Sequence, residues 1–300
     1  MKPVSMSQTP PVVIVGCGYV GRRLARQLLG EGYTVTGLVR SAGSVAALQT
    51  LGISPVQVDL DGSAELPSFT SAGAKLYYFA PPPSEGDSDP RLRRVLAALT
   101  TAPPQRIVYI STSGVYGDCA GAWVDETYPL KPGTPRARRR ADAEAALQAW
   151  SAATGVPVVI LRVPGIYGPG KLPLERLRKS LPLLREEDSP YTNRIHVDDL
   201  ITVCRAAMVR GQPGKAYNVS DGQPSNMTDY FNRIADFTGL PRPPLIGRDE
   251  IDQLSPGMRG FMEESKRLDT RRMCEELGIE LRYPTLEAGL ESCLAETGWD

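Results

Sequence analysis

The sequence predicts an α/β protein with a doubly wound parallel sheet and a small, mostly helical lobe toward the C-terminus. Short apolar, β-branched runs such as PVVIVG (11–16) are typical of strands that are buried on both faces of a sheet. These runs alternate with helical patterns through the first half of the chain, which favours parallel strands joined by crossover helices. After Gly165 the sequence becomes rich in loops and proline, which indicates a change of architecture.

The expected elements follow this alternation from the N-terminus. Residues 1–10 are expected to be a flexible tail, and the first helix is expected over 19–30, where apolar residues recur on one face. Further helices are expected over 41–52 and 135–153, the second with apolar residues as far as Ala153 on one face. Further strands are expected at 34–39, 54–60, 74–80, 106–112 and 156–163.

Two domains are expected from the change in composition after Gly165. The sheet domain covers 1–165, and the segment 194–221 returns to it with a capped helix and one more strand, KAYNVSDG. The small lobe then comprises 166–193 and 222–300.

Composition excludes several classes of partner. Lys+Arg and Asp+Glu both number 34, so the net charge is +0 and we expect neither nucleic acid nor a membrane as partner. Five cysteines without a CxxC pair and a single histidine, His196, predict reduced thiols and no metal site. The N-terminus lacks the apolar core of a signal peptide, so a cytoplasmic location is expected.

The strongest local motif is GCGYVG (16–21), which matches G-x-G-x-x-G directly after a strand and at the start of a helix. In a Rossmann-type fold, Gly16 permits a tight turn, Gly18 lets the backbone approach a pyrophosphate, and Gly21 allows close helix–strand packing. The free N–H groups of the helix start favour phosphate. The predicted cofactor contacts here are Gly16, Cys17, Gly18, Tyr19, Val20 and Gly21.

The end of the second strand indicates which dinucleotide is bound. NAD sites place an acidic residue there, whereas this chain has Arg40, followed by Ser41. A guanidinium can bind a 2′-phosphate through paired hydrogen bonds, so NADP is preferred, with NAD as the alternative. Asp59 and Leu60 are expected to flank the adenine. Alternatively, Arg40 is an ordinary surface arginine at the end of a strand, and Asp59 has only a capping role.

Five stretches together resemble the extended short-chain dehydrogenase/reductase family of nucleotide-sugar epimerases and dehydratases. They are VYISTSGVYGD (108–118), LRVPGIYGPG (161–170), RIHVDDL (194–200), KAYNVSDGQP (215–224) and SKRLDTRRMCEELGIELRYPTLEAGL (265–290). The resemblance implies further cofactor contacts at Ala80, Pro81, Thr112, Arg140 and Val163. It also implies a small-molecule substrate and a homodimer.

One departure separates this chain from that family. The positions of the catalytic tyrosine and lysine hold Arg136 and Arg140, so the chain most resembles an atypical subgroup without that pair. Arginine does not exchange a proton near neutrality, because its pKa lies above about 12. Arg140 can still hold a ribose, and Thr112 falls at the family's catalytic Ser/Thr position. Tyr116 is the best substitute proton donor, with packing or substrate stacking as its alternative role.

The remaining candidates concern substrate and structure. The predicted substrate contacts are Ser113, Tyr116, Tyr167, Arg136, Lys266 and Arg267. His196 is expected to be structural, at a helix start capped by Asp198 and Asp199. The leading function is an NADP-dependent epimerase/dehydratase or reductase acting on a nucleotide sugar or related carbonyl compound. The alternative is a catalytically inactive NADP(H)-binding sensor or scaffold.

Overall fold

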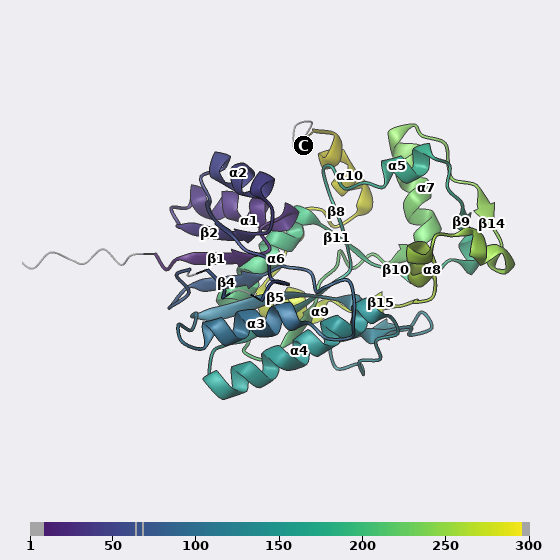
Figure 1. Cartoon of the computed structure of the whole chain (residues 1–300). Helices are drawn as coiled ribbons and strands as arrows, with labels where there is room; N and C mark the ends of the chain where they lie inside the picture. Colours follow the sequence, from purple (N-terminus) through teal and green to yellow (C-terminus); the bar gives the residue numbers. More distant parts are fainter. Residues whose placement is uncertain (1–8, 64, 68, 296–300) are drawn as a thin grey trace, which may run out of the picture. The chain divides into compact units, whose positions relative to one another are not determined.

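The computed structural model describes residues 9–63, 65–67 and 69–295 (Figure 1). Most of the predicted N-terminal tail and the last five residues of the predicted lobe therefore lie outside the described residues. None of the helices described is long and apolar enough to cross a membrane.

A seven-stranded sheet in the order β12-β7-β5-β4-β1-β2-β3 forms the centre of the fold. Its strands are β1 (Val12–Val15), β2 (Val35–Val39), β3 (Ser54–Gln57), β4 (Lys75–Tyr78), β5 (Arg106–Thr112), β7 (Val158–Val163) and β12 (Ala216–Asn218). β1 pairs in parallel with β2 on one side and β4 on the other, so Val12 lies opposite both Val35 and Lys75. The strand order reverses at this point, which confirms the predicted doubly wound sheet.

Helices flank the sheet: α1 (Tyr19–Gly30), α2 (Ala42–Thr50), α3 (Pro90–Leu99), α4 (Pro135–Thr154) and α6 (Val197–Arg210). Figure 1 shows α1 and α2 on one side of the strands and α3 and α4 on the other. In α4, Leu147 is buried, whereas Ala153 is exposed. The apolar face predicted for this helix is therefore buried at Leu147 but no longer at Ala153, in its last turn.

The chain folds as two compact units. Unit 1 comprises Met1–Ile110, Arg139–Ile160 and Ala207–Lys215. Unit 2 comprises Ser111–Arg138, Leu161–Ala206 and Ala216–Asp300. Both β5 and β7 therefore begin in unit 1 and end in unit 2, and the predicted division at residue 165 stays a prediction.

Short strands and helices make up the rest of unit 2. The strands are β6 (Trp123–Val124), β8 (Gly165–Tyr167), β9 (Leu183–Leu184), β10 (Tyr191–Thr192), β11 (Arg194–His196), β13 (Ser225–Asn226), β14 (Leu245–Ile246) and β15 (Arg267–Leu268). The helices are α5 (Leu174–Arg178), α7 (Met227–Thr238), α8 (Pro256–Met262), α9 (Arg271–Leu277) and α10 (Leu286–Ala295). Leu184, Phe231, Ile234 and Leu286 belong to one buried apolar cluster, which gives these short elements a common core.

Candidate cofactor and substrate sites

The glycines of the 16–21 loop differ in what surrounds them. Gly16 has φ +83°, and a Cβ there would lie 2.4 Å from the backbone nitrogen of Ala80, so only glycine fits this turn. A Cβ at Gly21 would lie 3.0 Å from Cγ2 of Ile14, which agrees with close packing of α1 on β1. No protein atom lies within 4 Å of a Cβ built at Gly18. Gly18 therefore borders open space that a ligand can enter.

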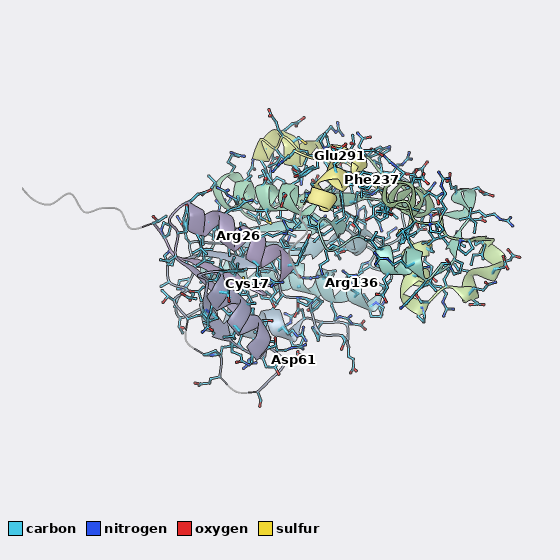
Figure 2. The ribbon with its side chains drawn as sticks, turned by 90° about the horizontal axis from the view of Figure 1, so that it is seen from above. Cys17, Arg26, Asp61, Arg136, Phe237 and Glu291 are labelled. Carbon is cyan, nitrogen blue, oxygen red and sulfur yellow. The ribbon has the colours of Figure 1, made fainter. Side chains whose placement is uncertain are left out.

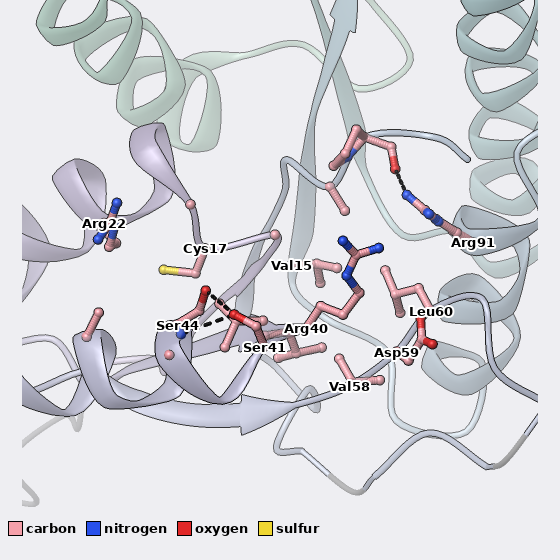
Figure 3. Close-up of a pocket in the computed structure, with 18 residues that line it drawn as sticks. Val15, Cys17, Arg22, Arg40, Ser41, Ser44, Val58, Asp59, Leu60 and Arg91 are labelled. Carbon is pink, nitrogen blue, oxygen red and sulfur yellow. Dashed lines mark hydrogen bonds between the residues drawn. The ribbon is translucent and has the colours of Figure 1, made fainter. Parts of the chain in front are cut away.

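A pocket of about 680 Å³ opens beside this loop, entirely within unit 1 (Figure 3). Its volume is in the usual range for small-molecule sites. The structure brings these predicted cofactor residues together in its lining: Gly16, Cys17, Gly18, Arg40, Ser41, Asp59, Leu60, Ala80 and Pro81. Tyr19, Val20 and Gly21 lie in the first turn of α1 and are not among the lining residues.

The loop offers the charge and donors that an anion needs. α1 begins at Tyr19 without a side-chain cap and without an acidic residue in its first turn, so no carboxylate of that turn competes for its N-terminal N–H groups. Burial raises the pKa of Cys17 to about 12, although the charge of Arg22 opposes this shift. The Cys17 sulfur is therefore a thiol at neutral pH and does not compete with a phosphate.

Arg40 lies directly after β2 and is exposed. The amide nitrogen of Gln57 donates to its carbonyl oxygen at 3.2 Å, which fixes the backbone at this point. Ser41 caps α2, because its hydroxyl oxygen accepts the N–H of Ser44 at 3.2 Å. Among the described residues, none forms a hydrogen bond or ion pair with the Arg40 guanidinium. This cation therefore enters the pocket without a protein partner, beside a helix N-terminus.

Arg140 is placed differently from Arg40. It is buried, and its NH1 donates to the hydroxyl of Tyr109 and to the carbonyl oxygen of Ile110, each at 2.9 Å. Burial raises the pKa of Tyr109 to about 12, against the effect of Arg140. Arg140 thus supports the sheet of unit 1, and its role at a ribose stays a prediction. Arg136 is exposed in the first turn of α4.

Thr112 ends β5 and caps the short 3-10 helix Ser113–Tyr116. Its Oγ1 accepts the N–H of Gly114 at 3.2 Å, and both Thr112 and Ser113 are partly exposed. The Thr112 hydroxyl can therefore still donate a hydrogen bond. Val163 is buried at the end of β7 and is not among the pocket-lining residues.

Tyr116 is fully buried in unit 2, and its hydroxyl belongs to an internal network. The hydroxyl donates to Oδ1 of Asn218 at 2.7 Å and accepts from NH1 of Arg162 at 2.9 Å. The Asn218 amide group donates in turn to the carbonyl oxygens of Val124 and Asp269. This arrangement speaks against proton transfer by Tyr116 and favours the packing role that the sequence left open.

The predicted helix start at His196 forms in a different way. Nδ1 of His196 accepts the N–H of Asp198 at 3.2 Å, so the histidine itself caps α6 and its ring proton lies on Nε2, 2.9 Å from Oγ of Ser292. The Asp199 carboxylate instead accepts the N–H groups of Arg282 and Tyr283. The predicted capping by Asp199 is therefore wrong, because its carboxylate binds another segment, whereas the capping role of Asp198 stays a prediction. The structural role of His196 fits this geometry.

Four polar side chains of unit 2 each keep one buried atom without a hydrogen-bond partner among the described residues: the Tyr167 hydroxyl, Nε of Arg176, NH1 of Arg194 and Oδ2 of Asp221. Tyr167 lies against α10, where a Cβ at Gly289 would come within 2.1 Å of its hydroxyl. Burial raises the pKa of Tyr167 well above its ordinary value. Burial also raises the pKa of Asp221 to about 6, against the charge of Arg194.

Lys266 and Arg267 already have partners inside unit 2. Nζ of Lys266 is 2.8 Å from Oε2 of Glu264, and both side chains are largely buried. The Arg267 guanidinium lies over the rings of Trp123 and Tyr191, at 5.4 and 4.7 Å from their centroids. The predicted binding of a diphosphate by Lys266 and Arg267 stays a prediction.

Comparison with known proteins identifies the family to which the chain belongs. The model of the NAD dependent epimerase/dehydratase family matches residues 91–220. A solved structure of a functionally unknown conserved protein from Silicibacter pomeroyi DSS is 35% identical, with TM-score 0.84, and the match covers 96% of this chain and 99% of that one. The chain belongs to the NAD-dependent epimerase/dehydratase family. The subgroup without the Tyr–Lys pair stays a prediction.

Two further proteins match nearly the whole chain, one by sequence and one by structure. Protein YeeZ of Escherichia coli (strain K12) is 28% identical over 284 residues, which cover 91% of this chain and 96% of YeeZ. The UDP-glucuronic acid 4-epimerase from Bacillus cereus, solved in complex with NAD, is 18% identical with TM-score 0.74. That match covers 94% of this chain and 96% of the epimerase, and it shows the fold alone.

In the part of the chain that the structure describes, no group of three His, Cys, Asp or Glu side chains is placed to hold a metal ion.

Proposed function

We propose that this family member binds NADP(H) in preference to NAD(H), and that it is an epimerase/dehydratase or reductase acting on a nucleotide sugar or a related carbonyl or hydroxyl compound. The observation that carries the proposal is Arg40: an exposed guanidinium with no partner among the described residues lies in the pocket, where NAD sites have an acid. The open space at Gly18 supports a fit to the pyrophosphate.

Each part of the dinucleotide has candidate residues in unit 1. The backbone from Gly16 to Gly18 and the start of α1 would hold the pyrophosphate. Arg40 and Ser41 would hold the 2′-phosphate, and Asp59 would flank the adenosine. A bound nicotinamide dinucleotide supplies hydride transfer. Of the residues in unit 2, the Thr112 hydroxyl can donate a hydrogen bond to a substrate oxygen.

Isothermal titration of the purified chain with NADPH and NADH tests the cofactor assignment. Arg40→Ala is expected to weaken NADPH binding by about 10- to 100-fold, since hydrogen bonds to charged groups contribute about 1.5–3 kcal/mol. NADH affinity should stay the same, and Arg40→Asp should reverse the preference. Arg26→Ala on the exposed face of α1 is the matched control, because Arg26 is not among the pocket-lining residues (Figure 2). Equal losses for both dinucleotides would defeat the assignment.

A catalytically inactive NADP(H) sensor is the second candidate. It is favoured by Arg136 and Arg140 at the positions of the usual proton-transferring pair, and by the internal hydrogen bonds of the Tyr116 hydroxyl. Stopped-flow oxidation of bound NADPH, screened against nucleotide sugars and small carbonyl compounds, separates the two. Oxidation by one substrate class supports the enzyme, whereas tight binding without oxidation by any class supports the sensor.

A further inference from the structure

Arg91 links two chain segments that line the cofactor pocket. It lies in the first turn of α3, where its Nε donates to Oδ1 of Asp61 at 2.6 Å and its NH2 donates to Oδ2 of the same carboxylate. NH1 donates to the carbonyl oxygens of Pro81 at 2.9 Å and Pro82 at 3.2 Å. Because the guanidinium is a rigid fork, one side chain ties the segment after β3 to the segment after β4.

The carboxylate that Arg91 holds lies near the cation assigned above to the 2′-phosphate. Asp61 directly follows two pocket-lining residues, Asp59 and Leu60, and Figure 3 shows the guanidinium groups of Arg40 and Arg91 on that side of the pocket. The hydrogen bond from Arg91 holds the pKa of Asp61 below its ordinary value, and the charges of Arg91 and Arg40 lower it further. Asp61 is therefore ionised at neutral pH and within electrostatic range of Arg40, while Arg91 engages both of its oxygens.

We propose that Arg91 determines cofactor specificity through Asp61: it keeps that carboxylate away from Arg40 and so leaves Arg40 available for the 2′-phosphate of NADP. The inference rests on the NADP preference proposed above. Without Arg91, Asp61 would pair with Arg40 and repel an incoming phosphate. NAD carries a hydroxyl at this position, so its binding would change only through the loosened loops. Arg91 is thus a positioning residue for this selectivity.

The test measures the ratio of Kd for NADH to Kd for NADPH in the full chain by isothermal titration. Arg91→Met is expected to lower this ratio about three- to tenfold, a modest effect because Asp61 is exposed and screened by solvent. Adding Asp61→Asn to Arg91→Met should restore the wild-type ratio, because the competing charge is then absent although the loops remain untied. The defect of Arg91→Met should also shrink at about 0.5 M salt, since salt screens exposed charges.

A double variant that keeps the lowered ratio would overturn the inference, because the loops rather than the Asp61 charge would then carry the effect. If thermal melting shows that Arg91→Met does not fold, Arg91→Lys replaces it; lysine keeps a cation but loses the fork, and the same restoration by Asp61→Asn is required. Arg40→Ala distinguishes a failure of the proposed NADP preference from a failure of the proposed role of Arg91. An unchanged ratio in Arg40→Ala defeats the NADP preference, whereas an unchanged ratio in Arg91→Met alone defeats only this inference.

Discussion

Three cations that the sequence marks as ligand contacts, Arg40 of unit 1 and Lys266 and Arg267 of unit 2, differ in what holds them. In unit 1, the Arg40 guanidinium enters the pocket with no hydrogen bond or ion pair to any described residue. In unit 2, Lys266 is paired with Glu264, and Arg267 is stacked against two aromatic rings. Residue type alone does not distinguish these cases. The presence or absence of an internal partner does, because a buried charge that is already paired gains little from a ligand.

The cofactor pocket and the interior of unit 2 also differ in their cost to stability. Arg40 in the pocket is exposed, where a charge costs little, whereas Asp221, Arg194 and Tyr167 of unit 2 each bury one atom without a hydrogen-bond partner among the described residues. Unit 1 has such atoms too, on Tyr78, Asp89 and Arg139, none of which lines the pocket. A buried polar atom without a partner is expensive. We therefore expect substitutions at pocket positions that border open space, such as Gly18 and Arg40, to change binding, and substitutions at tightly packed or buried positions to change stability.

The strongest test of this contrast lies within the glycine loop itself. Gly16→Ala should lower the free energy of unfolding by about 3 kcal/mol or more, because its Cβ would collide with the backbone of Ala80 at a positive φ. Gly18→Ala should leave stability within about 0.5 kcal/mol and weaken NADPH binding at least about tenfold. Urea denaturation and titration measure the two effects. A Gly18→Ala variant as unstable as Gly16→Ala would break the contrast.

Asp221 should make unit 2 sensitive to pH. Its folded pKa of about 6 lies above its ordinary value of 3.8, so the folded state binds its proton more tightly than the unfolded state does. The contribution of this group to stability therefore falls as pH rises from about 4 to about 6, by about 3 kcal/mol in all. Asp221→Asn should stabilise the protein at pH 7.5 by up to this amount and have little effect at pH 4. Urea denaturation at both pH values decides this, and equal effects at the two would contradict it.

The smallest expected effect is that of Tyr116→Phe, which distinguishes a packing role of Tyr116 from a role in proton transfer. Tyr116→Phe removes one hydrogen bond to Asn218 and one from Arg162, and should cost about 1–2 kcal/mol of stability. If Tyr116 only packs, turnover per folded molecule should change less than about threefold; loss of a proton donor would lower it by about 10²- to 10⁴-fold. Thermal melting and single-turnover kinetics on the same preparation provide both readouts. A large kinetic loss at unchanged stability would restore the catalytic assignment.

Much of the sheet could be predicted because its strands are locally encoded. The ranges 19–30 and 106–112 match α1 and β5 to the residue, since a glycine turn and a β-branched run mark their limits. The two-residue strands of unit 2 were not predictable, because pairing with distant segments defines them. Helix α3 was missed although its signal is present: Asp89 caps it and Pro90 occupies its first position.

The parts of the candidate site that lie in a local sequence motif, the glycine turn and the end of β2, could be predicted. Gly16, Gly18 and Arg40 follow from the turn and from the end of β2. Arg91 could not be found, because no local pattern shows that α3 brings a guanidinium to two other segments. The burial of Arg140 depends on its contact with Tyr109, a partner 31 residues away. Spacing places a residue on an element, but long-range packing decides whether its side chain is free.

The buried thiol in the glycine loop has a practical consequence for labelling. With a pKa of about 12, Cys17 carries almost no thiolate at neutral pH, and thiolate is the species that maleimides attack. Cys274 on α9 is exposed, whereas Cys119 and Cys204 are buried. Cys293 is half-buried, so a Cys293→Ser variant leaves Cys274 as the accessible thiol among the described residues. A fluorophore attached there does not block the phosphate loop, and dinucleotide titrations can be followed optically.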